Sequence, residues 1–284
     1  MKHVAESIRA RLLNLSRESN VPFNGLLEQY ATGRFLWRLS QSRYRTRFFL
    51  KGAQLFRIWG AAMHRPTRDV DFLSYGDPSE EGIAAAFEEI CQLPCNPEDG
   101  LIWGKVCGEP IRGDVKYGGI RAQLQASLAG VRILLQIDVG FGDAITPGAL
   151  ESEWAGLLNF PAASLLVYPP ETVIAGKMEA AVTLGIRNSR MKDFFDMHWL
   201  SRHLSFDAEV LKSAIAATFE RRGTKVPQGV PLALTDDFAN DPNKQTQWKA
   251  FLRKSDLEFI EFAEVIAELR KFIVPLLGDD EGIS

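Results

Sequence analysis

Two short stretches of the sequence decide the fold: Lys51-Gly52-Ala53 and, about 17 residues later, Asp69-Val70-Asp71-Phe72-Leu73. The residues before the glycine, 45–50, predict a short strand, and the apolar residues after it recur at helical spacing. The stretch from Asp69 to Leu73 alternates polar and apolar residues, as a half-buried strand does. The order of strand, glycine turn, helix and strand predicts an α/β core.

Asp69 and Asp71 are the first candidate site residues. Side chains at positions i and i+2 of a strand point to the same face, so the two carboxylates project side by side, whereas Val70 and Phe72 face a core. Adjacent carboxylates repel each other unless a cation joins them. Divalent ions that prefer oxygen ligands are the usual solution, so the pair predicts a site for Mg²⁺ or Mn²⁺.

A β-hairpin supplies a third candidate carboxylate. Residues 120–128 and 131–139 both alternate apolar with polar residues around the turn Ala129-Gly130. Asp138 lies on the face opposite to the apolar residues of its strand. Three carboxylates on two strands could bind two metal ions about 3.5–4 Å apart, which would activate a hydroxyl and neutralise a leaving pyrophosphate. The alternative is that Asp-x-Asp marks only the end of a strand.

The segment between the first strand and the helix is a candidate phosphate site. Lys51, Gly52 and Ala53 stand at a junction where backbone N–H groups can bind phosphate, and glycine lets the backbone approach a ligand closely. Thr67, just before the second strand, is a further candidate nucleotide contact. His64, on the same predicted loop, has no assigned role.

The chain divides into three predicted segments: a helical N-terminal arm at 1–44, an α/β core at 45–160 and a mostly helical C-terminal half at 161–284. Within them, the patterns predict helices at 80–92, 171–184, 192–203 and 246–276, an irregular insertion at 94–118 and a polar connection at 222–245.

Five motifs follow one another along the chain: Lys51-Gly52-Ala53, Arg65-Pro66-Thr67-Arg68-Asp69-Val70-Asp71-Phe72, Asp138-Val139-Gly140-Phe141-Gly142-Asp143, Glu171-Thr172-Val173-Ile174-Ala175-Gly176-Lys177-Met178-Glu179-Ala180 and Arg190-Met191-Lys192-Asp193-Phe194-Phe195-Asp196. In this order they resemble the AbiEii/AbiGii-type toxin nucleotidyltransferases, over about residues 25–220. The family belongs to the DNA polymerase β-like nucleotidyltransferase superfamily, and the resemblance implies a small mixed sheet with flanking helices, followed by a mostly helical C-terminal half.

The resemblance also implies roles for individual residues. Gly52 would belong to the nucleotide-binding glycine motif, and Asp69 and Asp71 would be the metal-binding pair, with Asp138 as the superfamily's third carboxylate. Lys177 would contact the nucleotide, and Asp193 would be the acidic residue of the last motif. Ala53 departs from the family pattern, because Gly or Ser is common there and alanine offers no hydroxyl to a phosphate.

The function implied by the resemblance is transfer of a nucleotide from an NTP to an acceptor hydroxyl. The acceptor would be an RNA, with the 3′ end of a tRNA as the expected site. The protein would act as the toxin of a toxin–antitoxin or abortive-infection system used in phage defence, with a cognate antitoxin as a possible partner. Two alternatives stay open: a small molecule or protein as the acceptor, and a non-enzymatic interaction protein that has lost activity.

The residues of the last two motifs support these roles only in part. Lys177 lies at the edge of the apolar stripe of its predicted helix, from where it could reach a triphosphate or simply extend into solvent. Asp193 and Asp196 share one face of the next helix. Asp193 could hold Lys177 or a metal ion, and Asp196 could cap the helix, form an ion pair or take part in catalysis.

Charge is distributed unevenly along the chain. Residues 1–68 contain thirteen Lys and Arg against three Glu, a net charge of +10, although the whole chain has a net charge of −3. If residues 43–47 are extended, Arg43, Arg45 and Arg47 share one strand face and could guide an RNA backbone toward the metal site. The alternative is that these arginines pair with the acidic remainder of the chain.

Composition excludes several other classes of protein. The odd count of three cysteines fits a reducing compartment and argues against a disulfide scaffold. No signal-like apolar stretch opens the chain, and no uncharged apolar run approaches the ~20 residues needed to cross a bilayer. The sequence therefore predicts a cytoplasmic protein that has no membrane partner.

Overall fold

The computed structural model describes residues 2–60, 67, 69–111 and 118–277. The chain forms two compact units, which we treat separately. The first unit contains residues up to 142 together with 150–167, and the second contains residues 143–149 together with those from 168 onward. The two N-terminal helices thus belong to the same unit as the sheet. The three-segment division stays a prediction.

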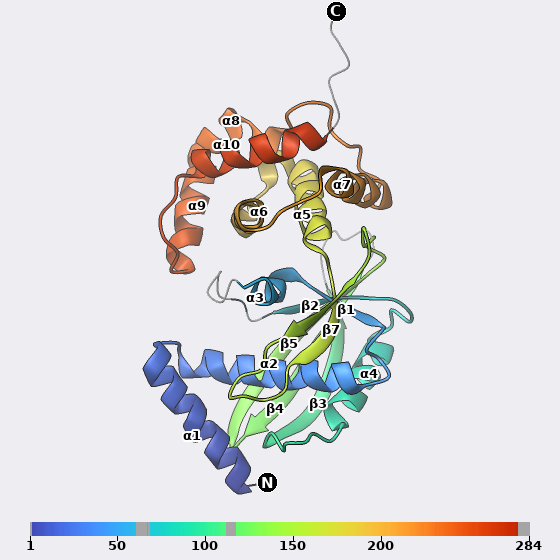
Figure 1. Cartoon of the computed structure of the whole chain (residues 1–284), viewed down its shortest axis with the longest axis vertical. Coiled ribbons are helices and arrows are strands. Elements are labelled where there is room, and N and C mark those ends of the chain that lie inside the picture. Colours follow the sequence, from blue (N-terminus) through green and yellow to red (C-terminus); the bar gives the residue numbers. More distant parts are fainter. Residues whose placement is uncertain (1, 61–66, 68, 112–117, 278–284) are drawn as a thin grey trace, which may run out of the picture. The chain divides into compact units, whose positions relative to one another are not determined.

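The first unit is built on a seven-stranded mixed sheet with the order β3-β4-β5-β2-β1-β7-β6 (Figure 1). Strand β2 runs parallel to β5, and β1 runs parallel to β7, whereas the other neighbours are antiparallel. The strands are β1 (Phe48–Lys51), β2 (Val70–Ser74), β3 (Leu101–Pro110), β4 (Gly119–Leu128), β5 (Val131–Phe141), β6 (Leu150–Trp154) and β7 (Ala163–Val167). The mixed α/β architecture expected from the sequence is confirmed.

Helices pack on one face of this sheet. Helix α2 (Phe23–Gln41) crosses the sheet and contacts β5 and β7, α4 (Glu80–Gln92) packs on β3, and α1 (Lys2–Ser19) packs on α2 and β4 (Figure 1). The alternation of apolar and polar residues in the β4–β5 hairpin explains why the helices cover this face. Every second residue of β4 and β5 is buried, from Ile120 to Leu128 and from Ile133 to Val139, and burial of this apolar face drives the packing. The polar residues in between face the other way.

Two local expectations need correction in the first unit. The segment 94–118 is not simply irregular, because it contains β3, the outermost strand, whose pairing with β4 shifts register between Trp103 and Val106. An edge strand with a register shift loses the regular alternation that identifies strands in a sequence. The first predicted strand begins only at Phe48, because residues 42–47 form turns.

The second unit is helical. Its helices are α5 (Pro170–Leu184), α6 (Met191–His203), α7 (Ala208–Arg222), α8 (Asp236–Asn240), α9 (Pro242–Lys254) and α10 (Phe262–Ile273). The helix predicted at 246–276 is therefore two helices, and the predicted connection at 222–245 contains α8. An aromatic cluster forms the core, in which Phe262 contacts Phe194 edge-on at 5.5 Å and stacks on Trp248 at 5.0 Å between ring centroids. None of the described helices is long and apolar enough to cross a lipid bilayer.

Candidate active site

The predicted carboxylates gather on the polar face of the sheet, where β2 and β5 run side by side. Asp71 and Asp138 are register partners in this parallel pair, so their side chains project from the same face. Asp69 lies just before β2, and its Oδ1 accepts a hydrogen bond of 3.1 Å from Nε2 of Gln136, two residues before Asp138. Val70 and Phe72 are buried on the opposite face, as expected.

Gly52 lies directly against one of these carboxylates. Strand β1 pairs with β2 so that Lys51 is opposite Asp71, and the chain then turns at Gly52 with a φ of +74° into a short 3₁₀ helix, η1 (Gly52–Gln54). A Cβ at position 52 would lie 2.2 Å from Oδ2 of Asp71. Both the positive φ and the close approach require glycine. The backbone of the glycine motif, with Ala53 inside η1, is thus held next to the candidate metal-binding pair.

Four charged residues form a row across four neighbouring strands. Lys51 of β1 is paired with Asp71 of β2, Asp71 with Asp138 of β5, and Asp138 with Arg121 of β4. We call this set the charged row. Register partners share a face, so the two carboxylates are flanked on that face by a lysine on one side and an arginine on the other. A row of this kind offers both acidic ligands for a cation and basic ligands for an anion.

Arg121 was missed by the sequence reasoning. Its Nε donates to Oδ1 of Asp138 at 2.9 Å and its Nη2 donates to Oδ2 at 2.8 Å, a two-pronged ion pair. Hydrogen bonding to Asp138 raises the pKa of Arg121, and Coulombic attraction to Asp69 adds to the effect. The signal was present in the sequence, because the two-residue turn Ala129-Gly130 fixes the hairpin register that places these residues opposite each other.

The donor set suits a divalent cation at Asp69 and Asp71. Carboxylate oxygens on one face are the ligands that Mg²⁺ and Mn²⁺ take in proteins. Across the parts of the chain that the structure describes, no group of three Asp, Glu, His or Cys side chains is arranged to hold a metal ion. Asp138 already uses both oxygens in the ion pair with Arg121, so its predicted role as a third metal ligand stays a prediction.

Lys177 of α5 and two aspartates of α6 form the second group of predicted site residues, within the second unit. Nζ of Lys177 lies 2.7 Å from Oδ1 of Asp193 and 2.8 Å from Oδ2 of Asp196. The Lys177 side chain is 15% exposed and that of Asp196 is fully buried. Burial lowers the pKa of Lys177, but the two carboxylates outweigh burial and hold the pKa above its usual range. Asp193 and Asp196 therefore fix one ammonium group between them.

A model of the family "Nucleotidyl transferase AbiEii toxin, Type IV TA system" matches residues 34–268. The chain belongs to the AbiEii family. The match includes both groups of site residues. The protein is thus a member of a family of nucleotidyltransferase toxins from type IV toxin–antitoxin systems.

Solved structures agree with this fold. JHP933 from Helicobacter pylori superposes with a TM-score of 0.54 at 16% identity, covering 89% of this chain and 91% of that one. A second H. pylori protein, solved as a candidate nucleotidyltransferase, superposes with a TM-score of 0.54 at 15% identity, covering 90% and 96%. At such low identity the likeness shows the fold alone. No curated protein matches the sequence significantly.

The basic residues expected to bind RNA are arranged differently in this AbiEii-family chain. Arg43, Arg45 and Arg47 lie in the turns at 42–47, so the predicted shared strand face is wrong. Arg43 is ion-paired with Glu89, and Arg45 with Glu151. Nη2 of Arg47 donates to the carbonyl of Asp77 at 2.9 Å. Glu89 and Glu151 lie in the acidic remainder of the chain, so the alternative of internal pairing is confirmed for Arg43 and Arg45, and both glutamates belong to the first unit.

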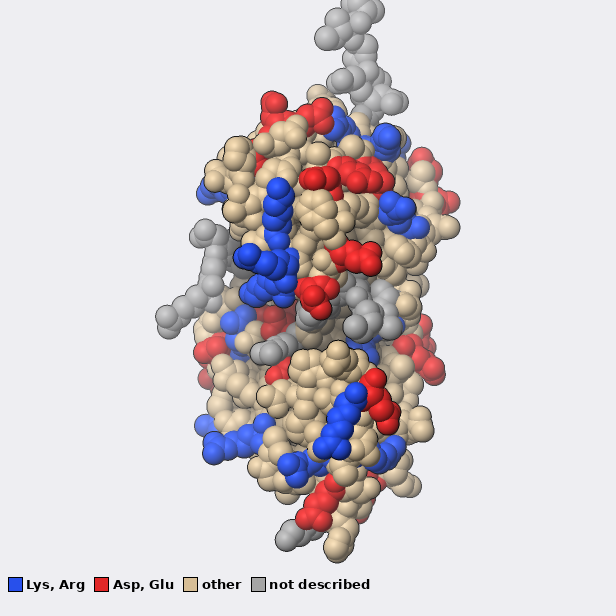
Figure 2. Space-filling model, turned by 90° about the vertical axis from the view of Figure 1, so that its left-hand side faces the viewer, with Lys and Arg blue, Asp and Glu red and all other residues tan. Residues whose placement is uncertain are grey.

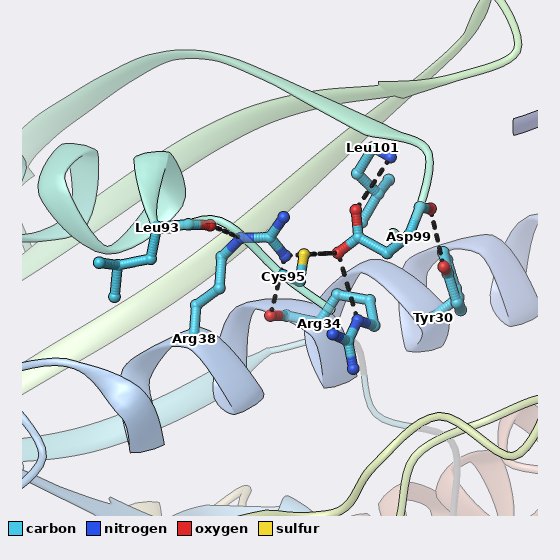
Figure 3. Close-up of polar contacts among 7 residues, drawn as sticks. All are labelled: Tyr30, Arg34, Arg38, Leu93, Cys95, Asp99 and Leu101. Atoms are coloured by element: carbon cyan, nitrogen blue, oxygen red, sulfur yellow. Dashed lines mark hydrogen bonds and ion pairs between the residues drawn. The ribbon is translucent and has the colours of Figure 1, made fainter. Parts of the chain in front are cut away.

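Two further arginines of the basic segment are buried. Arg34 and Arg38 of α2 both bind Asp99, which lies before β3 and is 3% exposed (Figure 3). Sγ of Cys95 donates to the same carboxylate at 3.1 Å, and the hydroxyl of Tyr30 donates to the carbonyl of Asp99 at 2.8 Å. This cluster anchors the loop before β3 on α2, which is a structural role. The side of the molecule in Figure 2 accordingly shows Lys and Arg interspersed with Asp and Glu.

The remaining candidates lie around the loop before β2. The hydroxyl of Thr67 lies 3.4 Å from the carbonyl oxygen of Asp69, which keeps this side chain near the carboxylate pair. His64, Arg65 and Arg68 lie outside the described residues.

Proposed function

We propose that this AbiEii-family chain transfers a nucleotide from an NTP to a hydroxyl group of an RNA, with the 3′ end of a tRNA as the acceptor. The observation that carries the proposal is the charged row with Gly52 against Asp71. In the reaction, the acceptor oxygen forms a bond to the α-phosphorus of the NTP, and the bond from that phosphorus to the pyrophosphate breaks.

Asp69 and Asp71 would hold Mg²⁺ or Mn²⁺, which neutralises the charge of the triphosphate when bound. The other residues act on the nucleotide directly. The turn at Gly52 and Ala53 brings backbone N–H groups to the phosphates, and Lys51 adds a positive charge at the end of β1. Gln136 holds Asp69 in its orientation. Thr67, in the loop before β2, is a further proposed nucleotide contact.

Lys177 is the proposed nucleotide contact of the second unit. An ammonium group has three N–H donors, and two of them point to Asp193 and Asp196. The third donor would bind a phosphate oxygen, in a direction fixed by the two aspartates. Asp193 and Asp196 would then act as positioning residues rather than as groups that touch the nucleotide.

The charge of the N-terminal segment supports an RNA acceptor. Arg43 and Arg45 are 71% and 44% exposed, and their partners Glu89 and Glu151 are also on the surface. Ion pairs between exposed side chains contribute little to stability, so RNA phosphates can replace these carboxylates at small cost. A tRNA acceptor and an NTP donor would place the activity in the cytoplasm, where a cognate antitoxin would counteract it.

The test is a transfer assay in which each of the four α-³²P-labelled NTPs is incubated with the protein, Mg²⁺ and total tRNA. We expect label in the tRNA band from at least one NTP, and none with Asp71→Asn. The matched control is Asp237→Asn, which changes an exposed carboxylate of α8 and should leave transfer intact. Labelling that does not depend on Asp71, or no labelling of any acceptor, would refute the proposal.

The internal pairing of Arg43 and Arg45 favours one second candidate, a nucleotidyltransferase whose acceptor is not RNA. Omitting the tRNA and adding cell lysate treated with ribonuclease separates the two candidates. Label transferred equally well to protein or to small molecules under those conditions would favour this second function.

A further inference from the structure

We propose that Arg121 is a phosphate-binding residue of the nucleotide site, and that Asp138 serves to hold its guanidinium group rather than to bind a metal ion. The inference deepens the proposed function and rests on it. It assigns a role to Arg121, the one residue of the charged row that lies outside all five sequence motifs.

The first support is the position of Arg121. It faces Asp138 across the β4–β5 hairpin, and Asp138 faces Asp71 across β5 and β2. The guanidinium group therefore lies on the same sheet face as the carboxylate pair, one strand beyond Asp138. Lys51 lies on the other side of Asp71, on the neighbouring strand β1. A phosphate chain bound at Asp69 and Asp71 through a cation would have a basic side chain on each flank.

The second support is the geometry of the ion pair. Asp138 receives one hydrogen bond on each oxygen from Arg121, at 2.9 and 2.8 Å, and its side chain is only 20% exposed. These bonds use two of the five N–H donors of the guanidinium group and fix its plane. The Arg121 side chain is 35% exposed, so the remaining donors are accessible to a ligand. A guanidinium group fixed in this way is suited to bind a phosphate through two oxygens.

The third support is charge. If Asp138 became a metal ligand, Arg121 would lose the carboxylate that pairs with it, and the metal ion and the guanidinium group would compete for the same two oxygens. If Asp138 holds Arg121 instead, the ion pair stays intact and the cation would be bound through Asp69 and Asp71. The attraction between Arg121 and Asp69 places the arginine within electrostatic reach of that cation's ligands.

The experiment compares Arg121→Gln, Asp138→Asn and the double variant with the wild-type protein in two binding assays. Calorimetry with the four nucleoside α,β-methylene triphosphates in Mg²⁺ measures nucleotide affinity without turnover. Titration with Mn²⁺ alone, followed by electron paramagnetic resonance, measures metal affinity. The matched control is Arg132→Gln, which changes an exposed arginine on β5 of the same sheet face.

We expect Arg121→Gln to weaken nucleotide binding roughly tenfold or more, the scale of losing hydrogen bonds to a charged group. Asp138→Asn should weaken it by a smaller factor, and the double variant should be no worse than Arg121→Gln, because Asp138 acts through Arg121. Arg121→Gln should not weaken Mn²⁺ binding, and Asp138→Asn should change it far less than the loss of a metal ligand would. Arg121→Lys, which keeps the charge but not the fork, should recover only part of the affinity.

Two results would overturn the inference while leaving the proposed function standing. Weakened Mn²⁺ binding by Asp138→Asn, with normal nucleotide binding by Arg121→Gln, would make Asp138 a metal ligand. Normal nucleotide and metal binding by both variants, with lower thermal stability, would make the pair purely structural. If the wild-type protein binds none of the nucleotides, the proposed function fails, and the inference fails with it.

Discussion

The two groups of charged residues differ in how deeply the protein buries them. In the first unit, the charged row lies on a half-exposed sheet face, where the Arg121 and Asp138 side chains are 35% and 20% exposed. In the second unit, Lys177 and its two aspartates are between 15% and 0% exposed and bind one another at 2.7–2.8 Å. The first arrangement leaves room for ligands, whereas the second is already assembled.

This difference predicts different consequences for mutation. Removing one partner from a buried ion pair leaves an uncompensated charge, which destabilises the fold strongly. Removing a carboxylate from a half-exposed face costs little stability, because water solvates what is left. Changes in the second unit should therefore appear first in stability, and changes in the charged row should appear first in activity.

The largest expected effect is that of Lys177→Met. The change leaves Asp193 and Asp196 buried without their cation, and it should lower the free energy of unfolding by about 3–5 kcal/mol. The position of Lys177 in the sequence, at the edge of an apolar stripe, gave no reason to expect a loss of stability, and the burial of Asp196 is what supplies it. Urea unfolding followed by circular dichroism measures the effect.

Lys192→Met is the matched control for Lys177→Met, because Lys192 is an exposed lysine of α6. Adding Asp196→Asn to Lys177→Met should restore part of the stability by removing one uncompensated carboxylate. If the Lys177→Met variant and the wild-type protein have the same midpoint of urea unfolding, the ion cluster does not stabilise the second unit. The comparison between the two units then fails.

The second prediction concerns the sheet face. Asp69→Asn and Asp71→Asn should each lower nucleotide transfer at least about 100-fold, the scale of losing a strong electrostatic stabiliser at a reacting group. Their unfolding curves should stay close to that of the wild-type protein, because both side chains lie on the half-exposed face. Near-normal transfer by either variant would remove that residue from the site.

The fold and the sheet positions of the candidate carboxylates could be predicted because strong local patterns encode them, whereas the roles of these carboxylates stay predictions. The alternation around Ala129-Gly130 fixed the β4–β5 hairpin, and the glycine before an apolar helix marked the turn at Gly52. Asp69 and Asp71 followed from the two-residue period of a strand. The parallel pairing of β2 with β5, which brings Asp71 beside Asp138, joins distant segments, and no local pattern predicts it. The family resemblance implied only that Asp138 is a third carboxylate of the site.

The basic side chains were predicted less well, because the sequence does not show which acidic residue pairs with a given arginine. Arg34 and Arg38 contribute to the positive excess of residues 1–68, yet both are buried on Asp99, 61–65 positions away. The turn conformation of residues 42–47 was missed because alternating arginines mimic the period of a strand. Arg121 was missed as well, although the hairpin register places it opposite Asp138.

The third prediction uses pH to test the ion cluster formed by Lys177, Asp193 and Asp196. The pKa of Lys177 is raised above its ordinary value of 10.5 in the folded protein. A raised pKa means that the charged lysine adds stability below pH 10.5, and that this stability is lost as the pH rises through the folded-state pKa. The difference in unfolding free energy between wild type and Lys177→Met should be constant from pH 7 to about 10 and shrink above it. If this difference in unfolding free energy instead increases above about pH 10, Lys177 is not stabilised in its charged form by the two aspartates.

The smallest expected effect concerns Arg43 and Arg45. Both are exposed and paired with exposed glutamates, so changing them together to Ala should leave thermal stability nearly unchanged. If they bind RNA phosphates, the dependence of tRNA affinity on salt should flatten by about 0.7–0.9 in log–log slope for each lost contact. Filter binding of a tRNA pool at several salt concentrations measures this slope, and calorimetry should show unchanged nucleotide binding.

Arg202 and Arg270 provide the matched control for that double change, because both are ion-paired arginines at the surface of the second unit. Changing them together to Ala removes the same charge, so a slope that flattens equally would show a general effect of net charge rather than a binding face. If the salt dependence of tRNA affinity flattens only in the Arg43 and Arg45 double variant, RNA phosphates replace the carboxylate partners of these two arginines. A flat slope for the wild-type protein would remove RNA as the acceptor, and the half-exposed charged row would then serve a different acceptor with the same nucleotide chemistry.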